Sequence, residues 1–274
     1  VRVARPAAGA LAAMRPPHVL SARFGAQVTL LGYGLDRATV KSGEAIDLDL
    51  YWKAEQDISG DLTVAVRLLD SRGQDIAERR GPPVNGDYPT SRWREGDALR
   101  DTHRLIPRAA AAAGKTSIRI ALIDEARGDA IGEITLAGPE IGERSRVFTA
   151  PAPQFPRAMS FADKLELLGF SVDGAIEAKG GVNLPRLTVP VGAALPLVLL
   201  WRGSAEMETS YTVFVQLLDG QGRLVAQHDG LPQDGAAPTS GWLPQEVVAD
   251  RHSVVVRRDL PPAEYTLIAG LYNA

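Results

Sequence analysis

Two Asp and His pairs have a spacing in this sequence that could support chemistry. Asp101 precedes His103 by two residues, and Asp250 precedes His252 in the same way. Side chains two residues apart lie on one face of a β-strand, so each carboxylate could orient its imidazole as a base or share a cation with it. Pairs of this kind also form at a surface or a sheet edge, where they only stabilise the strand. We favour this structural interpretation, because neither pair comes with a nucleophile.

The rest of the sequence offers no further catalytic constellation. His18 and His228 complete the four imidazoles, and none stands in the H-E-x-x-H spacing of a zinc enzyme. The chain has no cysteine and lacks both the phosphate-binding loop motif and the G-x-S-x-G motif. The acidic segments around Asp70 and Asp219 lack the oxygen ladder of a calcium loop, so we assign both residues to tight turns. The sequence therefore predicts no catalytic residue, no metal and no cofactor.

A Pro-Thr-Ser motif with nearby rings and arginines is the candidate ligand site. It occurs as PTSRW at residues 89–93 and as PTSGW at residues 238–242. In a carbohydrate-binding interpretation, exposed rings stack on a sugar and arginines donate hydrogen bonds to it. In the structural interpretation, which we favour because the second motif keeps only Pro, Thr, Ser and Trp, the tryptophan anchors a long loop. The candidate ligand-binding residues are Tyr88, Arg92, Trp93, Arg94 and Trp242.

The two motifs belong to an internal repeat. From Trp52 onward, residues recur at a constant offset of 149, and 18 of the 52 positions from 52 to 103 are identical without a gap. Chance does not produce this identity, so the chain contains two copies of one domain. Upstream, FGAQVTLLGYGLD at 24–36 matches FADKLELLGFSVD at 161–173 with an offset of 137. The second copy therefore has 12 extra residues between Asp173 and Pro190, which predict an enlarged loop or an added hairpin.

The offsets predict three segments along the chain. Residues 1–22 comprise the end of a preceding unit and a linker, residues 23–150 form copy one, and residues 151–274 form copy two. The sequence stops before any counterpart of GDAIGEITL and SRVF of copy one. We therefore expect copy two to be C-terminally incomplete and the sequence to be a piece of a longer chain.

Period-two alternation predicts β-strands in both copies. In LTVAVRLLD, Leu62, Val64, Val66 and Leu68 point to one side, and YTVFVQLLD repeats this pattern. Short strands with frequent turn signals, and no convincing apolar period of 3.6 residues, predict one antiparallel β-sandwich per copy. We expect the immunoglobulin or fibronectin-like type, with the jelly roll as the alternative. The tryptophans at the ends of two alternating strands, Trp52 and Trp201, are expected to fill the core between the sheets.

Composition limits the class of partner. With 30 basic and 33 acidic residues the net charge is −3, which gives no electrostatic reason to expect nucleic acid or an anionic membrane surface. The longest strongly apolar run, VGAALPLVLLW at 191–201, contains a proline and is shorter than the roughly 20 residues that span a bilayer. We therefore expect no nucleic-acid partner and no direct insertion of this chain into a membrane.

The combined pattern resembles tandem β-sandwich modules that lie C-terminal to polytopic membrane glycosyltransferases of Chloroflexi-like bacteria. The likeness is carried by FGAQVTLLGYGLD, SGEAIDLDLYW, YTVFVQLLDGQGRLVAQHDGLP and GLY, and it extends from Phe24 over nearly the whole chain. It implies an extracytoplasmic location, at the cell surface or on the periplasmic side, with a membrane tether in other parts of the chain. It also implies that sugar transfer belongs to a membrane-embedded part, and it assigns no catalytic residue here.

Three functions are therefore considered. The leading one is a non-catalytic extracytoplasmic accessory or spacer region of a larger membrane-linked protein, with glycans or the membrane-embedded part of its own chain as partners. The second is a carbohydrate-binding module that uses the Pro-Thr-Ser region. The third is a protein adhesion module that pairs through exposed sheet edges.

Overall fold

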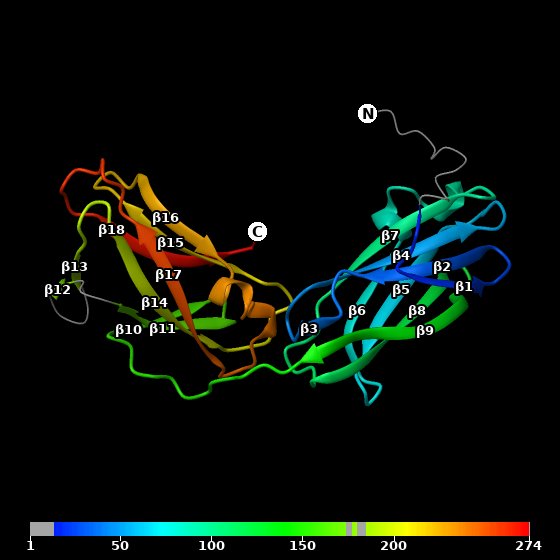
Figure 1. Cartoon of the computed structure of the whole chain (residues 1–274), viewed down its shortest axis with the longest axis horizontal. Coiled ribbons are helices and arrows are strands. Elements are labelled where there is room, and N and C mark those ends of the chain that lie inside the picture. Colours follow the sequence, from blue (N-terminus) through cyan, green and yellow to red (C-terminus); the bar gives the residue numbers. More distant parts are fainter. Residues whose placement is uncertain (1–13, 174–176, 180–184, 274) are drawn as a thin grey trace. The chain divides into compact units, whose positions relative to one another are not determined.

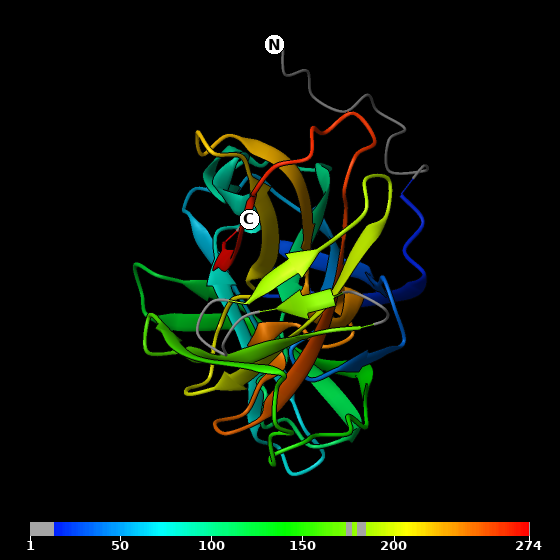
Figure 2. The ribbon, with the colours of Figure 1, turned by 90° about the vertical axis from the view of Figure 1, so that its left-hand side faces the viewer.

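The chain folds into two compact units made almost entirely of β-strands. The structure is a computed structural model that describes residues 14–173, 177–179 and 185–273. The units comprise Val1–Glu143 and Arg144–Ala274 (Figure 1), and Figure 2 shows their strands turned by 90°. The predicted all-β class is confirmed. Among the described residues, no helix combines the length and the apolar character that crossing a bilayer requires.

The first unit is a sandwich of two sheets. One sheet has the strand order β1-β2-β4-β7 and the other has the order β3-β9-β8-β5-β6. Neighbouring strands are antiparallel except for β3 and β9, which run parallel. The elements are β1 His18–Phe24, β2 Val28–Leu35, β3 Thr39–Lys41, β4 Ile46–Ala54, β5 Leu62–Leu69, β6 Asp75–Gly81, the 3-10 helices η1 Pro83–Gly86 and η2 Thr90–Arg92, β7 Ala98–Leu105, β8 Gly114–Asp124 and β9 Asp129–Gly142.

This strand order is the immunoglobulin-like one. Strands β2, β4 and β7 take the places of A, B and E in one sheet, and β9, β8, β5 and β6 take those of G, F, C and C′ in the other. The order therefore favours the immunoglobulin-like alternative over the jelly roll. The connection from β6 to β7 passes from one sheet to the other and contains η1 and η2. The Pro-Thr-Ser motif lies in this crossing connection.

The second unit repeats the arrangement. Its sheets have the orders β10-β11-β14-β17 and β16-β15-β18, and two short strands form a separate antiparallel pair, β12-β13. This pair is the hairpin expected among the extra residues of copy two, although its turn lies outside the described residues. The elements are β10 Phe155–Phe161, β11 Leu165–Val172, β12 Glu177–Lys179, β13 Arg186–Thr188, β14 Ala194–Gly203, β15 Thr212–Leu218, β16 Leu224–Gly230, η3 Pro232–Gly235, η4 Thr239–Gly241, β17 Val247–Val255 and β18 Thr266–Tyr272.

The core of each unit lies between its two sheets. Trp52 and Trp201 are fully buried, which confirms the core position expected for them. A phenylalanine edge meets each ring, with Phe24 at 5.2 Å from Trp52 and Phe161 at 5.5 Å from Trp201 between ring centroids. The alternation in β5 is also confirmed, because its inward residues Leu62, Val64, Val66 and Leu68 are all buried.

The repeated Leu-Leu-Gly segment has a packing reason. A Cβ atom at Gly32 would lie 2.4 Å from His18 O and 2.5 Å from the ring of Pro16, and one at Gly169 would meet Phe155 O and Pro153 in the same way. Only glycine lets the proline-containing segment approach this closely. Since β1 begins at His18, residues 18–22 belong to the first sheet, whereas the sequence placed them in a linker.

Candidate functional site

The threonine of each Pro-Thr-Ser motif bonds only to backbone. Thr90 Oγ1 accepts a hydrogen bond from Leu62 N at 2.7 Å and donates one to Gly60 O at 2.8 Å. Thr239 Oγ1 does the same with Tyr211 N at 2.9 Å and Thr209 O at 3.1 Å. Each hydroxyl thus ties the crossing connection to the start of the central strand, β5 or β15. The buried threonine has the structural role that we favoured for the motif.

The serine of each motif makes a contact that changes between the copies. In copy one, Ser91 N donates to Asp61 Oδ1 at 3.1 Å, and hydrogen bonds from the Ser91 side chain and amide hold the pKa of Asp61 below its ordinary value. In copy two, residue 210 is a serine, and its hydroxyl oxygen lies 2.7 Å from that of Ser240. The serine of the motif therefore bonds a charged carboxylate in copy one and a neutral hydroxyl group in copy two.

Both motif tryptophans are buried anchors. Trp93 and Trp242 have no exposed surface, and their indole Nε1 atoms donate to Tyr88 O at 3.0 Å and Ala237 O at 2.8 Å. The exposed ring faces of the carbohydrate-binding interpretation are therefore absent at both positions, because the rings are buried in the hydrophobic core of their unit. This observation corrects that expectation for Trp93 and Trp242.

The other candidate ligand-binding residues lie around this anchor in copy one. The Tyr88 hydroxyl lies 2.9 Å from both Arg92 O and Asp97 Oδ2, so its polar end is used within the loop. Arg94 donates through Nη1 to Trp93 O at 3.2 Å and lies 3.7 Å from Asp57 through Nε. The Arg92 side chain is exposed. Ligand binding by the partly exposed Tyr88 and by the two arginines stays a prediction.

Each Asp and His pair forms, but it is buried instead of lying at the surface. His103 Nε2 lies 2.7 Å from Asp101 Oδ2, and His252 Nε2 lies 2.7 Å from Asp250 Oδ2. All four side chains are almost completely buried. The expected pairing on one strand face is therefore confirmed, and its placement at a surface was wrong, because the inward face of β7 and β17 carries both residues.

The aspartate of each pair also holds a strained turn. Asp101 Oδ1 accepts from Val84 N at 2.8 Å, and Asp250 Oδ1 accepts from Gln233 N at 2.8 Å. The two turns that donate these hydrogen bonds contain consecutive left-handed residues, with φ of 53° at Val84 and 54° at Gln233. A residue other than glycine costs of order 1 to 3 kcal/mol in such a conformation, so the carboxylate offsets a local penalty. This use of the aspartate was not visible from its spacing.

In copy two, a second histidine continues the pair. His228 Nδ1 of β16 lies 2.9 Å from His252 Nδ1 of β17. Because Asp250 accepts from His252 Nε2, the neutral ring of His252 carries its proton on Nε2 and accepts at Nδ1. His228 Nδ1 is then the donor. The offset of 149 places Arg79 at the corresponding position of copy one.

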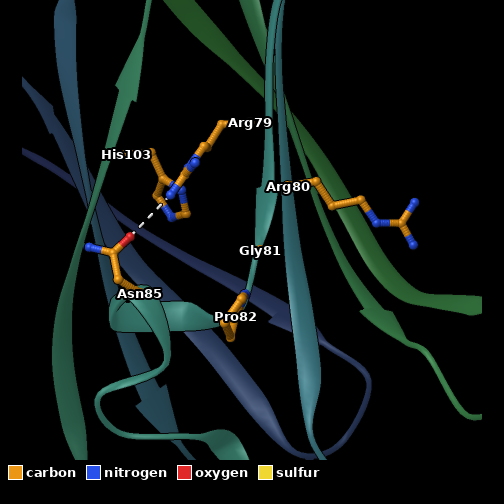
Figure 3. A pocket seen from close by; sticks show the side chains of 6 residues that line it. All are labelled: Arg79, Arg80, Gly81, Pro82, Asn85 and His103. Carbon is orange, nitrogen blue, oxygen red and sulfur yellow. Dashed lines mark hydrogen bonds between the residues drawn. The ribbon is translucent and has the colours of Figure 1, made fainter. Parts of the chain in front are cut away.

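A cavity lies beside His103 in copy one. It measures about 150 Å³ and is lined by Arg79, Arg80, Gly81, Pro82, Asn85 and His103. In Figure 3, Arg79 extends beside the imidazole and donates to Asn85 Oδ1 at 3.2 Å, whereas Arg80 points away from His103. Arg80 Nη2 is bound to Glu125 Oε1 at 2.8 Å. Arg79 and Asn85 were not predicted from the sequence. The alignment of Arg79 with His228 is the sequence signal that marks residue 79 as a position beside the buried histidine.

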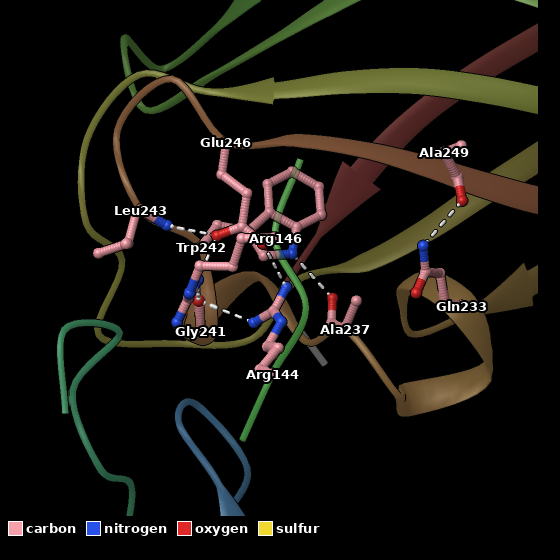
Figure 4. Close-up of polar contacts among 9 residues, drawn as sticks. All are labelled: Arg144, Arg146, Gln233, Ala237, Gly241, Trp242, Leu243, Glu246 and Ala249. Atoms are coloured by element: carbon pink, nitrogen blue, oxygen red, sulfur yellow. Dashed lines mark hydrogen bonds and ion pairs between the residues drawn. The ribbon is translucent and has the colours of Figure 1, made fainter. Parts of the chain in front are cut away.

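A buried ion cluster joins the segment before copy two to its Pro-Thr-Ser loop. Arg144 donates to Gly241 O at 2.7 Å and to Glu246 Oε1 at 2.9 Å, and Arg146 donates to Gly241 O at 2.8 Å and also bonds Glu246 (Figure 4). Leu243 N donates to the same carboxylate at 2.9 Å. Residues 144–150, which the sequence assigned to copy one, therefore begin the second unit.

The acidic turns have the role expected of them. Asp70 Oδ1 accepts from the backbone amides of Arg72 and Gln74, both at 2.9 Å. Asp219 Oδ1 accepts from those of Gln221 and Arg223 at the same distance, and the Arg223 amide is the main reason why the pKa of Asp219 is lowered. These carboxylates close turns. Within the described residues, no group of three or more His, Asp or Glu side chains is arranged to hold a metal ion.

Comparison with known proteins gives no family for this chain. No family model and no curated protein matches it. Among solved structures, it is similar to the alkylpurine DNA glycosylase AlkC of Pseudomonas fluorescens bound to DNA that contains an abasic site analogue. That likeness has a TM-score of 0.31 and 14% sequence identity, and it covers 43% of this chain and 31% of the glycosylase. A likeness this distant carries no argument about function.

Proposed function

We propose that this chain is a non-catalytic accessory region in which two immunoglobulin-like sandwiches serve a larger membrane-linked protein as a spacer or substrate-presenting module. The observation that supports this proposal is the use of the polar residues that both copies keep. In each copy, the repeated Thr, Trp and Asp bond the backbone of the crossing connection or of the strand beside it. The repeat thus preserves a way of fastening one loop.

The resemblance of the repeated motifs to glycosyltransferase-associated modules supports the identity of the larger protein. On this proposal the two units lie on the extracytoplasmic side, and sugar transfer takes place in a membrane-embedded part. The reading frame that encodes this chain should then also encode several apolar segments of roughly 20 residues. A reading frame with a secretion signal and only further repeats would instead support an adhesive surface array.

The direct test is an activity measurement on the purified chain. We expect no release or transfer of labelled sugar from nucleotide-linked or lipid-linked donors, with or without a glycan acceptor. The His103→Ala variant serves as the control for a contaminating enzyme, because it removes a buried imidazole that lines a cavity. Turnover by the chain that is lost in this variant would overturn the proposal.

The two alternatives give different signals with the same material. A carbohydrate-binding module that uses Trp93 would lose its glycan response in Trp93→Ala while it stayed folded. Because Trp93 is fully buried, we expect that substitution to lower the free energy of unfolding by about 3 to 5 kcal/mol. An adhesion module would self-associate in analytical sedimentation, whereas we expect the spacer to sediment as a monomer.

A further inference from the structure

We propose that the first unit binds a carboxylate group in the cavity between β6, η1 and β7, where Arg79 is its donor and the ring of His103 lines the site. The ligand would be a small organic acid or the acidic end of a sugar acid. This inference goes beyond the accessory role, because a spacer needs no ligand. It rests on the comparison between two copies of one scaffold in which different residues lie beside the buried histidine.

The second unit shows what this scaffold places next to the buried histidine. There His228 reaches across from β16, and its Nδ1 lies 2.9 Å from His252 Nδ1. His103 has the same bond from Nε2 to its aspartate, at the same 2.7 Å, so its Nδ1 also points toward the neighbouring strand, β6. The residue at this place in β6 is Arg79, and a cavity of about 150 Å³ lies between the side chains. The scaffold thus offers a hydrogen-bonding position for another molecule.

The charges around the cavity favour a carboxylate. Arg79 brings a guanidinium group whose fork matches the two oxygens of a carboxylate, and it uses one bond to Asn85 for positioning. Asp101 is bonded to His103 Nε2 and does not itself line the cavity. Arg80, the other lining cation, is directed toward Glu125.

The geometry of the cavity is held in place before any ligand arrives. Asn85, which positions Arg79, has a left-handed φ of 52° within η1. The preceding residue, Val84, is bound through its amide by Asp101, the same carboxylate that orients His103. One buried aspartate therefore fixes both sides of the site. Strained backbone held by a buried polar group is a common property of binding sites.

Nuclear magnetic resonance of the chain labelled with ¹⁵N-histidine tests the proposal. Sodium glucuronate is the probe, glucose is its neutral control, and inorganic phosphate is the competing oxyanion. We expect glucuronate to shift the His103 ring signals saturably, with half-saturation below the order of 10 mM. The His252 ring, which already has a histidine partner, is the internal control and should not respond.

Two matched variants assign the response to the cavity. Arg79→His gives copy one the residue that copy two has, so it should fold normally and weaken the glucuronate response at least tenfold. Arg72→His makes the same change at an exposed turn position and should leave the response unchanged. Unfolding midpoints of both variants show whether the unit is intact.

Four outcomes would overturn the inference. These are the absence of a saturable His103 shift, an equal shift with glucose, an undiminished shift in folded Arg79→His, and a stronger response to phosphate than to glucuronate. The activity test of the accessory role is separate, so either proposal can fail without the other.

Discussion

Replacement of Thr90 by Val tests whether the Pro-Thr-Ser motif fastens its loop. Thr90 is almost fully buried, and its hydroxyl satisfies Leu62 N and Gly60 O. Valine has the same shape but no hydrogen-bonding group, so it leaves the buried Leu62 amide without an acceptor. An unsatisfied buried donor costs about 1 to 3 kcal/mol, and the loss of the second bond adds about 1 kcal/mol. We expect Thr90→Val to lower the free energy of unfolding of the first unit by about 2 to 4 kcal/mol.

Two control variants distinguish the effect of losing the Thr90 hydroxyl from that of losing a methyl group and from that of replacing a threonine elsewhere in the unit. Thr90→Ser keeps both hydrogen bonds and removes one methyl group, so it should cost only about 1 kcal/mol. Thr39→Val changes an exposed threonine of the same unit and should stay within about 0.5 kcal/mol of the wild type. The expected order of stability is wild type and Thr39→Val, then Thr90→Ser, then Thr90→Val.

Urea denaturation with hydrogen exchange read by mass spectrometry resolves the two units, since peptides report on each separately. With a urea dependence of about 1 to 3 kcal/mol per molar, the expected loss moves the midpoint of the first unit down by roughly 0.7 to 4 M. The second unit should keep its midpoint. If the free energy of unfolding of Thr90→Val lay within about 0.5 kcal/mol of the wild-type value, the motif would not fasten the loop, and the role inferred from its contacts would be wrong.

Three further changes test other polar contacts, two of them by the urea midpoint of the affected unit and the third by the pH dependence of its stability. Glu246→Gln removes the charge that faces two arginines and should cost about 3 kcal/mol or more, while exposed Glu264→Gln should have no measurable effect. His252→Phe takes a donor from buried Asp250 and should cost about 1.5 to 3 kcal/mol, against about 1 kcal/mol for His228→Phe; equal losses would contradict this reasoning. The hydrogen bond from Arg104 lowers the pKa of Asp47 in the folded chain. The bond therefore stabilises the unit above the pKa that Asp47 has in the unfolded chain, and this stabilisation is lost as the pH falls through the lower pKa of the folded chain. Because Asp47 is about one-third exposed, Arg104→Gln should remove no more than about 1 kcal/mol of this acid dependence, measured from pH 7 down to 3.

Alternation and the repeat were enough to predict the fold class. The pattern in β5 depends on which side chains face the core, and the alternating residues Leu62, Val64, Val66 and Leu68 are buried as their period requires. The linker boundary near His18 was placed late because β1 follows two prolines and most of its residues are exposed or half-buried, so it lacks a clear apolar alternation. The strained turns at Val84 and Gln233 escaped prediction because neither residue type favours a left-handed conformation.

The candidate site was predicted only in part, because its members come from different strands. The spacing of Asp101 and His103 predicts their contact, since both lie on one face of β7. Nothing in the spacing says that this face points inward, or that Arg79 on β6 lies beside the imidazole. Burial of Trp93 is likewise decided by how the crossing connection folds over its own residues.

The residues around the motif tryptophan differ between the two copies, and the differences compensate for one another. In copy one, the Tyr88 hydroxyl lies 2.9 Å from Asp97 Oδ2. Copy two has alanine at the tyrosine position and Glu246 at the aspartate position, and there the carboxylate is bonded by Arg144 and Arg146. Each carboxylate therefore has a donor of its own, supplied by a different part of the chain. In both copies the carboxylate of the loop is hydrogen-bonded, although the residues that donate to it differ.

The exchange of His228 for Arg79 is of a different kind. His228 gives the buried ring of His252 a partner from within the chain, so that both nitrogens of that ring are hydrogen-bonded. Arg79 directs its guanidinium to Asn85, and both Arg79 and His103 line a cavity. The difference is what a binding role in the first unit requires, and Arg79→His, which gives His103 the histidine partner found in copy two, should leave that unit folded while it weakens the carboxylate response at least tenfold.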